Sequence, residues 1–249
     1  ANHPTGSLKF YNNFFKYFIK INIKKIFYFL SSGIICNSKS SANFFKKIYK
    51  KKKIINIYNP IKIKLRKKKY NNISNDIISV GRLQNQKNFY GLIKAFSIVL
   101  KKFPKKKMII IGSGQEEKKL KYLSKELKIN KQVKFLKYQN AEQKILNSKI
   151  FILNSLWEGL PNILIETQML KTPIISTNCE SGPSEILNNG KLGYLTPVDN
   201  EKKLALKIIN VLNNYGAAKK KAQLGLKYLN RFELNSQCQK YEKFLKKIN

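Results

Sequence analysis

The chain has 249 residues, 43% of them hydrophobic, and its 50 Lys and Arg against 13 Asp and Glu give a formal net charge of +37. This length supports one or two packed domains. Its 12 glycines and 7 prolines exclude a collagen-like or low-complexity chain. The cysteines, Cys36, Cys179 and Cys238, are odd in number and widely spaced. This spacing argues against a disulfide framework or a zinc site and favours a reducing compartment.

The excess of lysine has three possible interpretations. The basic residues are almost all lysine, and the chain is also rich in isoleucine and asparagine, which indicates a drift in overall composition. Attraction to an anionic membrane surface, worth about 1 kcal/mol per basic residue near the bilayer, is the second interpretation. Binding to nucleic acid is the third. We favour the first two and expect no nucleic-acid partner.

The N-terminal part of the chain is basic and aromatic. Residues 8–29 mix aromatic residues with lysines at helical spacing and predict a basic amphipathic helix. Such a helix either packs on its own domain or lies on an anionic membrane surface. No apolar run reaches the roughly 18–20 residues that span a bilayer, and the start shows no signal-peptide pattern. The first residue is Ala rather than Met, which suggests a fragment or a processed product.

A short strand–helix–strand pattern follows. We expect strands over 33–37 and 53–58 and, between them, a helix over 38–49 with Ser38 or Ser40 as its cap. The dipeptide Asn59-Pro60 ends the second strand, because the residue before proline is conformationally restricted. Residues 62–75 are rich in lysine and asparagine and predict a solvated linker, where we place a domain boundary.

Strands and helices alternate after this linker. The expected strands are 76–80, 107–111, 133–136, 150–153 and 173–177. The expected helices are 89–102, 116–127, 142–147, 162–170, 204–212, 221–229 and 238–246. Short buried strands alternating with amphipathic helices form right-handed βαβ units in a parallel sheet. The pattern therefore predicts a doubly wound α/β fold, which binds ligands at the carboxyl ends of its strands.

Two turns after predicted strands suit phosphate binding. Gly81 and Arg82 directly follow the first strand, and Lys87 precedes the next helix. Arginine offers a fork of donors to a phosphate and lysine a point charge, so the pair suits a diphosphate. In a chain this basic, a Gly-Arg pair after a strand also arises by chance. Gly112 and Gly114 form a second turn, but the full G-x-G-x-x-G pattern is missing, which excludes a dinucleotide site.

The most informative segment is residues 155–166, which read Ser-Leu-Trp-Glu-Gly-Leu-Pro-Asn-Ile-Leu-Ile-Glu. A loop with Gly159 and Pro161 follows a predicted strand, and a helix begins near Asn162. Glu158 lies in the loop and Glu166 about one turn inside the helix. Backbone N–H groups at a helix start can hold a diphosphate. A loop carboxylate can accept bonds from sugar hydroxyls, and the second carboxylate can take a ribose diol.

This segment resembles the E-x7-E signature of the retaining GT-B glycosyltransferases of family 4, the glycosyl transferases group 1. The strand and Gly-Arg-Lys pattern over 76–87 and the turn over 108–114 are also similar to that family. Residues 181–195 resemble transferases that build bacterial surface polysaccharides on lipid carriers. The similarity covers about residues 33–200. It implies a nucleoside-diphosphate sugar donor, a glycan or lipid-linked acceptor and a cytoplasmic enzyme, peripheral on an anionic membrane.

The resemblance implies a role for each site residue. Arg82 and Lys87 would bind the donor diphosphate and stabilise the leaving group, and Glu158 would contact the sugar. Glu166 would bind the ribose. The glycines of the two turns, Gly81, Gly112 and Gly114, would let the backbone approach the donor, and Gly159, Leu160, Pro161 and Asn162 would line the sugar–phosphate loop. No metal or other cofactor is expected, because the two cations hold the diphosphate.

Two positions need comment. Lys137 stands where the family usually has a glycine after the strand that ends at Leu136, and its side chain would narrow the nucleobase edge. The Asn2-His3-Pro4 stretch is similar to an acceptor-lobe segment. His3 is therefore either an acceptor-side residue or, as we favour, a surface-loop residue.

The resemblance also implies a domain organisation. Residues 1–61 would be the incomplete C-terminal part of an acceptor-side lobe, because a full lobe needs roughly 150 residues. Residues 76–230 would be the nucleotide-sugar lobe, and 231–249 a helix that packs back toward the first lobe. We expect an N-terminally truncated fragment that is inactive alone. The alternatives are a basic nucleic-acid-binding α/β domain and a GT-B relative with epimerase or phosphorylase activity.

Overall fold

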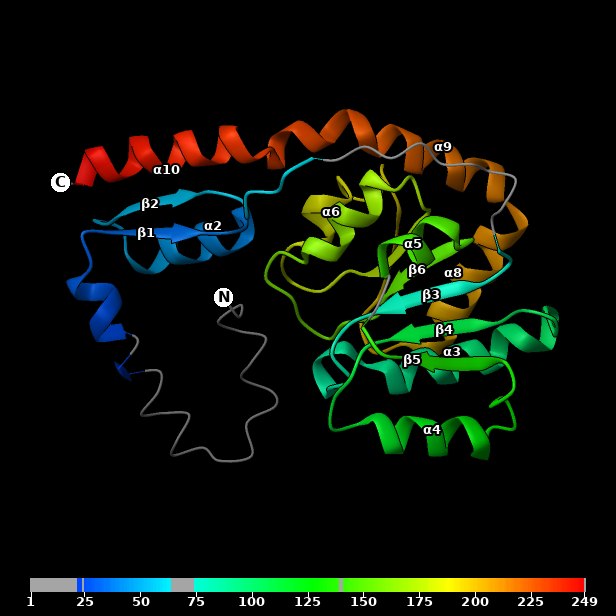
Figure 1. Ribbon diagram of the computed structural model, residues 1–249. Helices are drawn as coiled ribbons and strands as arrows, with labels where there is room; N and C mark the ends of the chain where they lie inside the picture. The colour runs from blue at the N-terminus through cyan, green and yellow to red at the C-terminus, as the bar shows by residue number, and fades with distance from the viewer. Residues whose placement is uncertain (1–21, 24, 64–73, 139–140, 249) are drawn as a thin grey trace.

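The computed structural model describes residues 22–23, 25–63, 74–138 and 141–248 (Figure 1). His3, most of the predicted 8–29 helix and most of the predicted 62–75 linker lie outside these residues. The described chain forms a six-stranded sheet flanked by helices and a separate two-stranded sheet. The prediction of an α/β architecture built on parallel strands is confirmed.

The large sheet consists of short parallel strands. They are β3 (Ile77–Val80), β4 (Met108–Ile111), β5 (Val133–Leu136), β6 (Ile150–Leu153), β7 (Ile174–Thr177) and β8 (Tyr194–Thr196). Their order is β5-β4-β3-β6-β7-β8, and every neighbouring pair is parallel. The order reverses between β3 and β6. The crevice outside the carboxyl ends of these two strands is where doubly wound proteins bind ligands.

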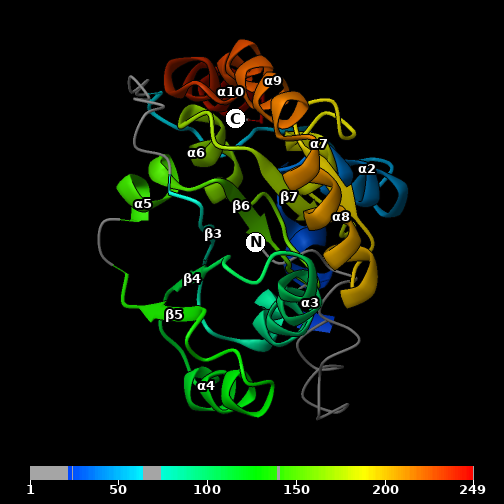
Figure 2. The same ribbon diagram turned by 90° about the vertical axis from the view of Figure 1, so that its right-hand side faces the viewer.

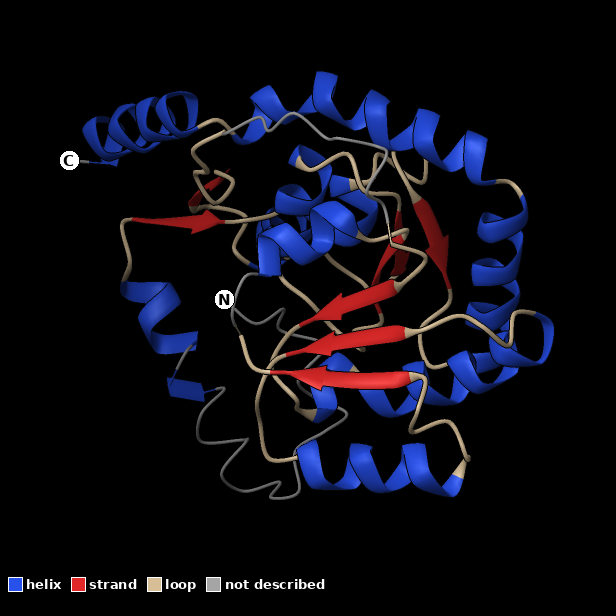
Figure 3. Cartoon of the chain, turned by 45° about the vertical axis from the view of Figure 1, so that its right-hand side comes forward, coloured by secondary structure: helices blue, strands red, loops and turns tan. Residues whose placement is uncertain are grey.

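Helices cover both faces of this sheet. They are α3 (Phe89–Lys102), α4 (Glu117–Glu126), α5 (Ala141–Asn147), α6 (Asn162–Met169), α7 (Pro183–Ile186), α8 (Glu201–Asn213) and α9 (Tyr215–Gly225), with the 3₁₀ segments η3 (Asn85–Lys87) and η4 (Leu226–Phe232). Figure 2 shows α3 and α8 on one side of the sheet and α5 and α6 on the other. In Figure 3 the neighbouring strands β3, β4 and β5 point the same way, so their carboxyl ends meet at one edge.

The core lies in two layers because successive strand residues point to opposite faces. On β3, Ile77 joins the cluster that packs on α3, α4 and α8, whereas Ile78 joins the cluster that packs on α5, α6 and η4. On β6, Ile150 and Phe151 alternate in the same way, and all four of these side chains are fully buried. Burial on both faces explains why the strands are continuous apolar runs.

A smaller βαβ unit precedes the large sheet. Strands β1 (Gly33–Cys36) and β2 (Lys53–Asn56) are parallel and joined by α2 (Lys39–Ile48), which Ser38 caps by accepting from the Ser41 N–H. We refer to residues 33–58 as the N-terminal unit. Preceding residues 22–30 are helical where described.

The C-terminal helix α10 (Leu234–Ile248) lies along the N-terminal unit (Figure 1). Lys53 Nζ donates to the Lys247 carbonyl (2.6 Å), and the Tyr58 N–H donates to Gln237 Oε1 (3.0 Å). Buried Phe244 packs so closely on Gly33 that a Cβ there would lie 2.7 Å from its ring. The last helix therefore leaves the large sheet and contacts the N-terminal unit.

The sequence misplaced or missed several late elements. The helix predicted over 221–229 is wrong in its bounds: α9 begins at Tyr215 and gives way to η4 at Leu226. Alanines and lysines after Gly216 favour the helix enough to outweigh that glycine. The short elements η3, α7 and β8 were not predicted. None of the helices in the described residues has the length and apolar character that a bilayer crossing requires.

Candidate functional site

A cleft of about 630 Å³ opens beside the carboxyl ends of β3 and β6. Most of the predicted site residues line it: Gly81, Arg82, Lys87, Gly112, Glu158, Leu160, Pro161, Asn162 and Glu166. Two predicted residues, Gly114 and Gly159, do not. The turn after β3, the turn after β4 and the loop after β6 are separated by up to 80 positions in the chain, and the parallel sheet brings them to one edge.

A buried ion pair lies in this cleft. Lys87 Nζ donates to Glu158 Oε1, and the two side chains are 15% and 8% exposed. The Ser155 hydroxyl donates to the same oxygen at 2.6 Å. Removing charges from water is costly unless they are paired and hydrogen bonded, and both conditions are met here. Among the described residues no group bonds to Glu158 Oε2, so this oxygen can accept from a ligand.

Small residues make room for the lysine. A Cβ on Gly81 would lie 3.4 Å from Lys87 Cδ, so the lysine stem passes directly over Gly81. A Cβ on Gly112 would lie 1.9 Å from the Gly81 carbonyl oxygen, so only glycine lets the turns after β3 and β4 approach. Gly114 meets the Leu83 carbonyl in the same manner and supports the turn from outside the cleft.

The cleft offers further anion-binding groups. Arg82 is exposed at the cleft and forms no ion pair with any described residue. Helix α6 begins at Asn162, and its N-cap residue Pro161 makes no side-chain hydrogen bond to the helix N–H groups. Free N–H groups at a helix start attract anions. A diphosphate placed between Arg82 and α6 would meet donors from both sides.

Glu166 lines the same cleft and also a neighbouring cavity of about 1040 Å³. Burial, and to a lesser extent the charge of Glu142, raises the pKa of the Glu166 carboxyl. Tyr138 and Ile163 line both spaces, so the two are adjacent. The continuous space has room for an extended ligand, with Glu158 near one end and Glu166 between the two cavities.

Sequence reasoning missed several residues of this site. Ser155 precedes Glu158 by three positions, a spacing at which a hydroxyl can reach a loop carboxylate, and this signal could have been used. Ser113 and Tyr138 line the cleft after β4 and β5. Lys137, the residue that replaces the expected glycine, is not among the residues that line it, so its predicted effect on the nucleobase edge stays a prediction.

The described residues contain no group of three or more His, Cys, Asp or Glu side chains arranged to hold a metal ion.

The fold and the cleft together define the class of protein: a doubly wound α/β lobe with two cations, two carboxylates and a helix start at the point where the strand order reverses. Residues 61–227 match the model of the family described as Glycosyl transferases group 1, and the chain belongs to this family.

Curated relatives cover much of the chain. It is 40% identical over 161 residues to an uncharacterized glycosyltransferase of Methanocaldococcus jannaschii, a match of 61% of this chain and 40% of the relative. A Campylobacter jejuni N-acetylgalactosaminyltransferase named for a diphospho-undecaprenol acceptor is 30% identical over 66% of this chain and 46% of its own length. The capsular polysaccharide glycosyltransferase CapM of Staphylococcus aureus is 28% identical over 80% and 57%. The chain thus spans about half the length of these relatives.

Solved structures share the fold. Anabaena HepE in complex with UDP-glucose superposes with a TM-score of 0.84 at 19% identity, covering 99% of this chain and 71% of that protein. A variant of Staphylococcus aureus TarM, solved with UDP, superposes with a TM-score of 0.78 at 24% identity, covering 88% and 44%. Both support the GT-B assignment of the fold.

Proposed function

We propose that this chain carries the donor side of a glycosyltransferase that moves a sugar from a nucleoside-diphosphate sugar to an acceptor hydroxyl with retention of configuration. The observation that carries the proposal is the Lys87–Glu158–Ser155 cluster in the cleft beside Arg82 and the start of α6. Family membership and the UDP complexes of HepE and TarM support the choice of donor.

Each group in the cleft has a part in the proposed reaction. The bond from the anomeric carbon to the diphosphate breaks with its electron pair on the phosphate oxygen. A bond to the acceptor oxygen forms, and the proton of the acceptor hydroxyl passes to the leaving diphosphate. Arg82 and Lys87 neutralise the charge that develops on the leaving diphosphate. Glu158 Oε2 accepts from sugar hydroxyls, and Glu166 from the ribose diol. We propose that no metal is needed, because these cations already face the diphosphate.

Two substitutions test the proposal. In the protein as the cell makes it, Lys87→Ala and Glu158→Ala should each lower kcat at least about 100-fold, which corresponds to roughly 2.7 kcal/mol. Lys121→Ala is the matched control, because Lys121 also pairs with a glutamate but on an exposed helix surface. Transfer from a radiolabelled sugar nucleotide is the measurement, with and without EDTA. Rates like the wild type in both site variants would refute the assignment.

We further propose a glycan or lipid-linked acceptor at an anionic membrane surface, on the cytoplasmic side. In the helical residues 25–30, Phe27, Phe29 and Leu30 are about 70% exposed beside Lys25. Exposed aromatic and aliphatic side chains next to lysines suit the membrane interface. The name of the Campylobacter relative, which specifies a diphospho-undecaprenol glycan as acceptor, supports this choice.

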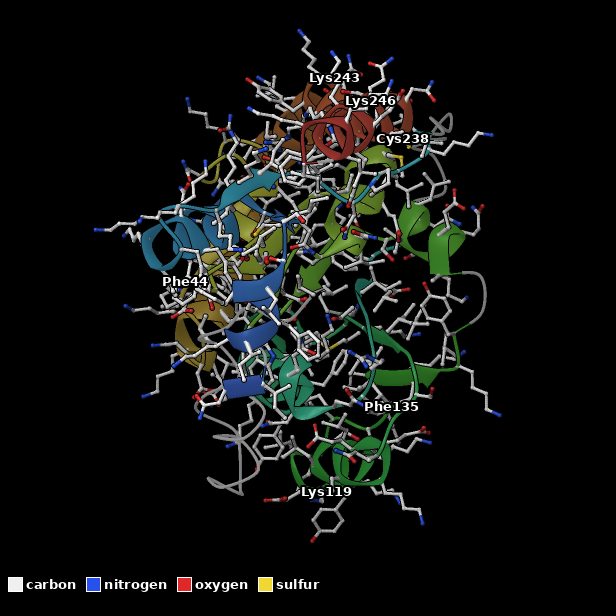
Figure 4. The ribbon with its side chains drawn as sticks, turned by 90° about the vertical axis from the view of Figure 1, so that its left-hand side faces the viewer. Phe44, Lys119, Phe135, Cys238, Lys243 and Lys246 are labelled. Carbon is white, nitrogen blue, oxygen red and sulfur yellow. The ribbon has the colours of Figure 1, made fainter. Side chains whose placement is uncertain are left out.

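Vesicle sedimentation tests the membrane proposal. The chain should bind phosphatidylglycerol-containing vesicles and release them in high salt, and Phe27→Ser with Leu30→Ser should weaken binding. Binding by charge alone would not depend on these two side chains. Lysines lie at both ends of the molecule, since Lys119 of α4 is at the opposite end from Lys243 and Lys246 of α10 (Figure 4). The double variant therefore separates the apolar contribution from the charge. Equal binding by wild type and the double variant would reject a role for the apolar residues.

A further inference from the structure

The segment that follows β7, residues 178–186, lies between the N-terminal unit and the cleft and includes α7. We call it the β7 loop. We call residues 157–162 the donor loop. Buried Ser181 donates its hydroxyl hydrogen to the Gly159 carbonyl of the donor loop (3.0 Å). The same hydroxyl is hydrogen bonded to Ser38, the cap of α2, at 2.8 Å. One serine therefore joins the start of α2 to the residue next to Glu158.

Glu185 makes a second connection to the start of α2. The Lys39 N–H donates to both of its carboxylate oxygens (3.1 and 3.0 Å), and the Tyr58 hydroxyl donates to one of them (2.5 Å). A carboxylate at the N-terminus of a helix interacts favourably with the helix dipole. The Ser40 hydroxyl also donates to the Glu180 carbonyl (3.0 Å). Helix α2 and Tyr58, which follows β2, are thus both held in position by the β7 loop.

The β7 loop and the donor loop also pack directly against each other at Gly182. Gly182 has φ of +82°, and a Cβ there would lie 2.4 Å from the Gly159 carbonyl oxygen and 2.6 Å from Pro161 Cδ. No side chain separates the two loops at this point, so a shift of one displaces the other. Asn59 adds a direct contact, donating to Asn162 Oδ1 at 2.8 Å.

We propose that Ser181 and Glu185 are positioning residues through which the docked N-terminal unit fixes the donor loop, and with it Glu158. Their role in transfer rests on the proposed function. The contacts of α2 with the β7 loop are hydrogen bonds, each of which adds a modest net stability, and Tyr58 adds an apolar contact by packing its ring on Phe232. The donor loop is therefore held in its working position only while the N-terminal unit makes these contacts.

Trp157 makes the proposal measurable, because it is the only tryptophan of the chain and lies half-buried in the donor loop. Ser181→Ala and Glu185→Gln should each change its emission maximum and its quenching by acrylamide, without any donor present. In transfer assays both should lower kcat about 10- to 100-fold, the effect of a small misplacement of a catalytic group. UDP affinity should fall much less than kcat, because Arg82 lies outside the donor loop and still binds the diphosphate.

Two matched controls separate positioning from general damage. Ser184→Ala removes a hydroxyl from α7 that forms no hydrogen bond with the described residues, and Glu242→Gln removes a charge from an exposed helical pair. Both should behave like the wild type. If Ser181→Ala does not fold, as judged by circular dichroism, Tyr58→Phe replaces it as the test variant. This substitution removes only the hydroxyl that donates to Glu185.

The outcomes distinguish this proposal from the proposed function. The positioning role would be overturned if Ser181→Ala and Glu185→Gln matched the two controls in Trp157 emission and in kcat. A parallel loss of UDP affinity and kcat would also overturn it, since that is the result of general destabilisation. If the wild type neither binds UDP nor transfers sugar, the proposed function fails, while the emission of Trp157 still tests the connection from α2 to the donor loop.

Discussion

At the scale of single residues, Glu166 shows how the role we propose for a carboxylate in the cleft opposes stability. Its carboxyl is half-buried near Glu142, and both features raise its pKa above the ordinary 4.5. The folded protein therefore keeps the Glu166 proton to a higher pH than the unfolded chain does. As pH rises from 4.5 through the folded-state pKa, the free energy of unfolding decreases, because ionisation is easier in the unfolded chain.

Glu166→Gln should therefore stabilise the free protein at pH 7. The neutral amide avoids the desolvation of a charge, and we expect Tm to rise by about 2 °C. The advantage should vanish below pH 4.5, where the wild-type carboxyl is protonated in both states. Thermal unfolding from pH 4 to 8 checks this, and Glu142→Gln, which removes the neighbouring charge, should show part of the same gain. A gain that persisted at pH 4 would contradict the electrostatic explanation.

The residues of the cleft were predicted where one short segment carries the signal. Glu158 and Glu166 share a loop and the helix that follows it, so their spacing is visible in the sequence. Arg82 and Lys87 were predicted because each follows or precedes a recognisable element. Ser181 and Glu185 were not given a role, because their partners Ser38 and Lys39 lie more than 140 positions away and on another unit. Contacts of that kind depend on tertiary packing alone.

At the scale of elements, the turn from η3 to α3 positions Lys87. Asn88 adopts the left-handed conformation (φ 45°, ψ 47°), and its side chain caps α3 by accepting from the Gly91 N–H at 2.9 Å. Buried Asn154 at the end of β6 donates to the Asn88 carbonyl at 2.9 Å. This strong cap also explains why the bounds of α3 were predicted correctly from the sequence.

Substitutions at Asn88 should separate its two roles. Asn88→Ala loses the cap and leaves in the left-handed region an alanine, which tolerates it less well than asparagine, so we expect a loss of about 2 kcal/mol in the free energy of unfolding. Asn88→Gly tolerates the conformation and should cost under about 1 kcal/mol. Urea denaturation of the two variants measures the difference. Equal losses would show that the backbone conformation contributes little.

The elements that were missed are short. Strand β8 has three residues and lies at the edge of the sheet, where a periodic pattern cannot develop. Helix α7 has four residues and begins after Gly182, and its position depends on the donor loop and on Arg231, which donates to the Glu185 and Ile186 carbonyls. The buried four-residue strands and the long helix α3 were predicted well, because their apolar residues reflect the core directly.

At the scale of the whole molecule, α10 contacts the N-terminal unit, whose own apolar cluster is small. The six-stranded sheet packs its helices in two apolar layers, whereas the N-terminal unit has a small cluster around Ile34, Cys36, Ala42 and Phe45. A two-stranded sheet is marginal by itself. The N-terminal unit therefore relies on its contacts to α10, chiefly Phe244 over Gly33, and on the hydrogen bonds of α2 to the β7 loop.

Phe244→Ala should loosen the N-terminal unit selectively. Truncation of a buried Phe costs about 3–5 kcal/mol in a rigid core, and here the loss falls on the contact between α10 and β1. Hydrogen exchange should show faster exchange of the β1 and β2 amides, while amides of β3, β4 and β6 keep their protection. Leu245→Ala is the control, because that neighbouring side chain is 49% exposed.

Because α2 docks beside the donor loop, Trp157 emission should change in Phe244→Ala but not in Leu245→Ala. Uniform loss of protection across both sheets would mean that the molecule unfolds as a single cooperative unit and that the N-terminal unit has no separate docking equilibrium.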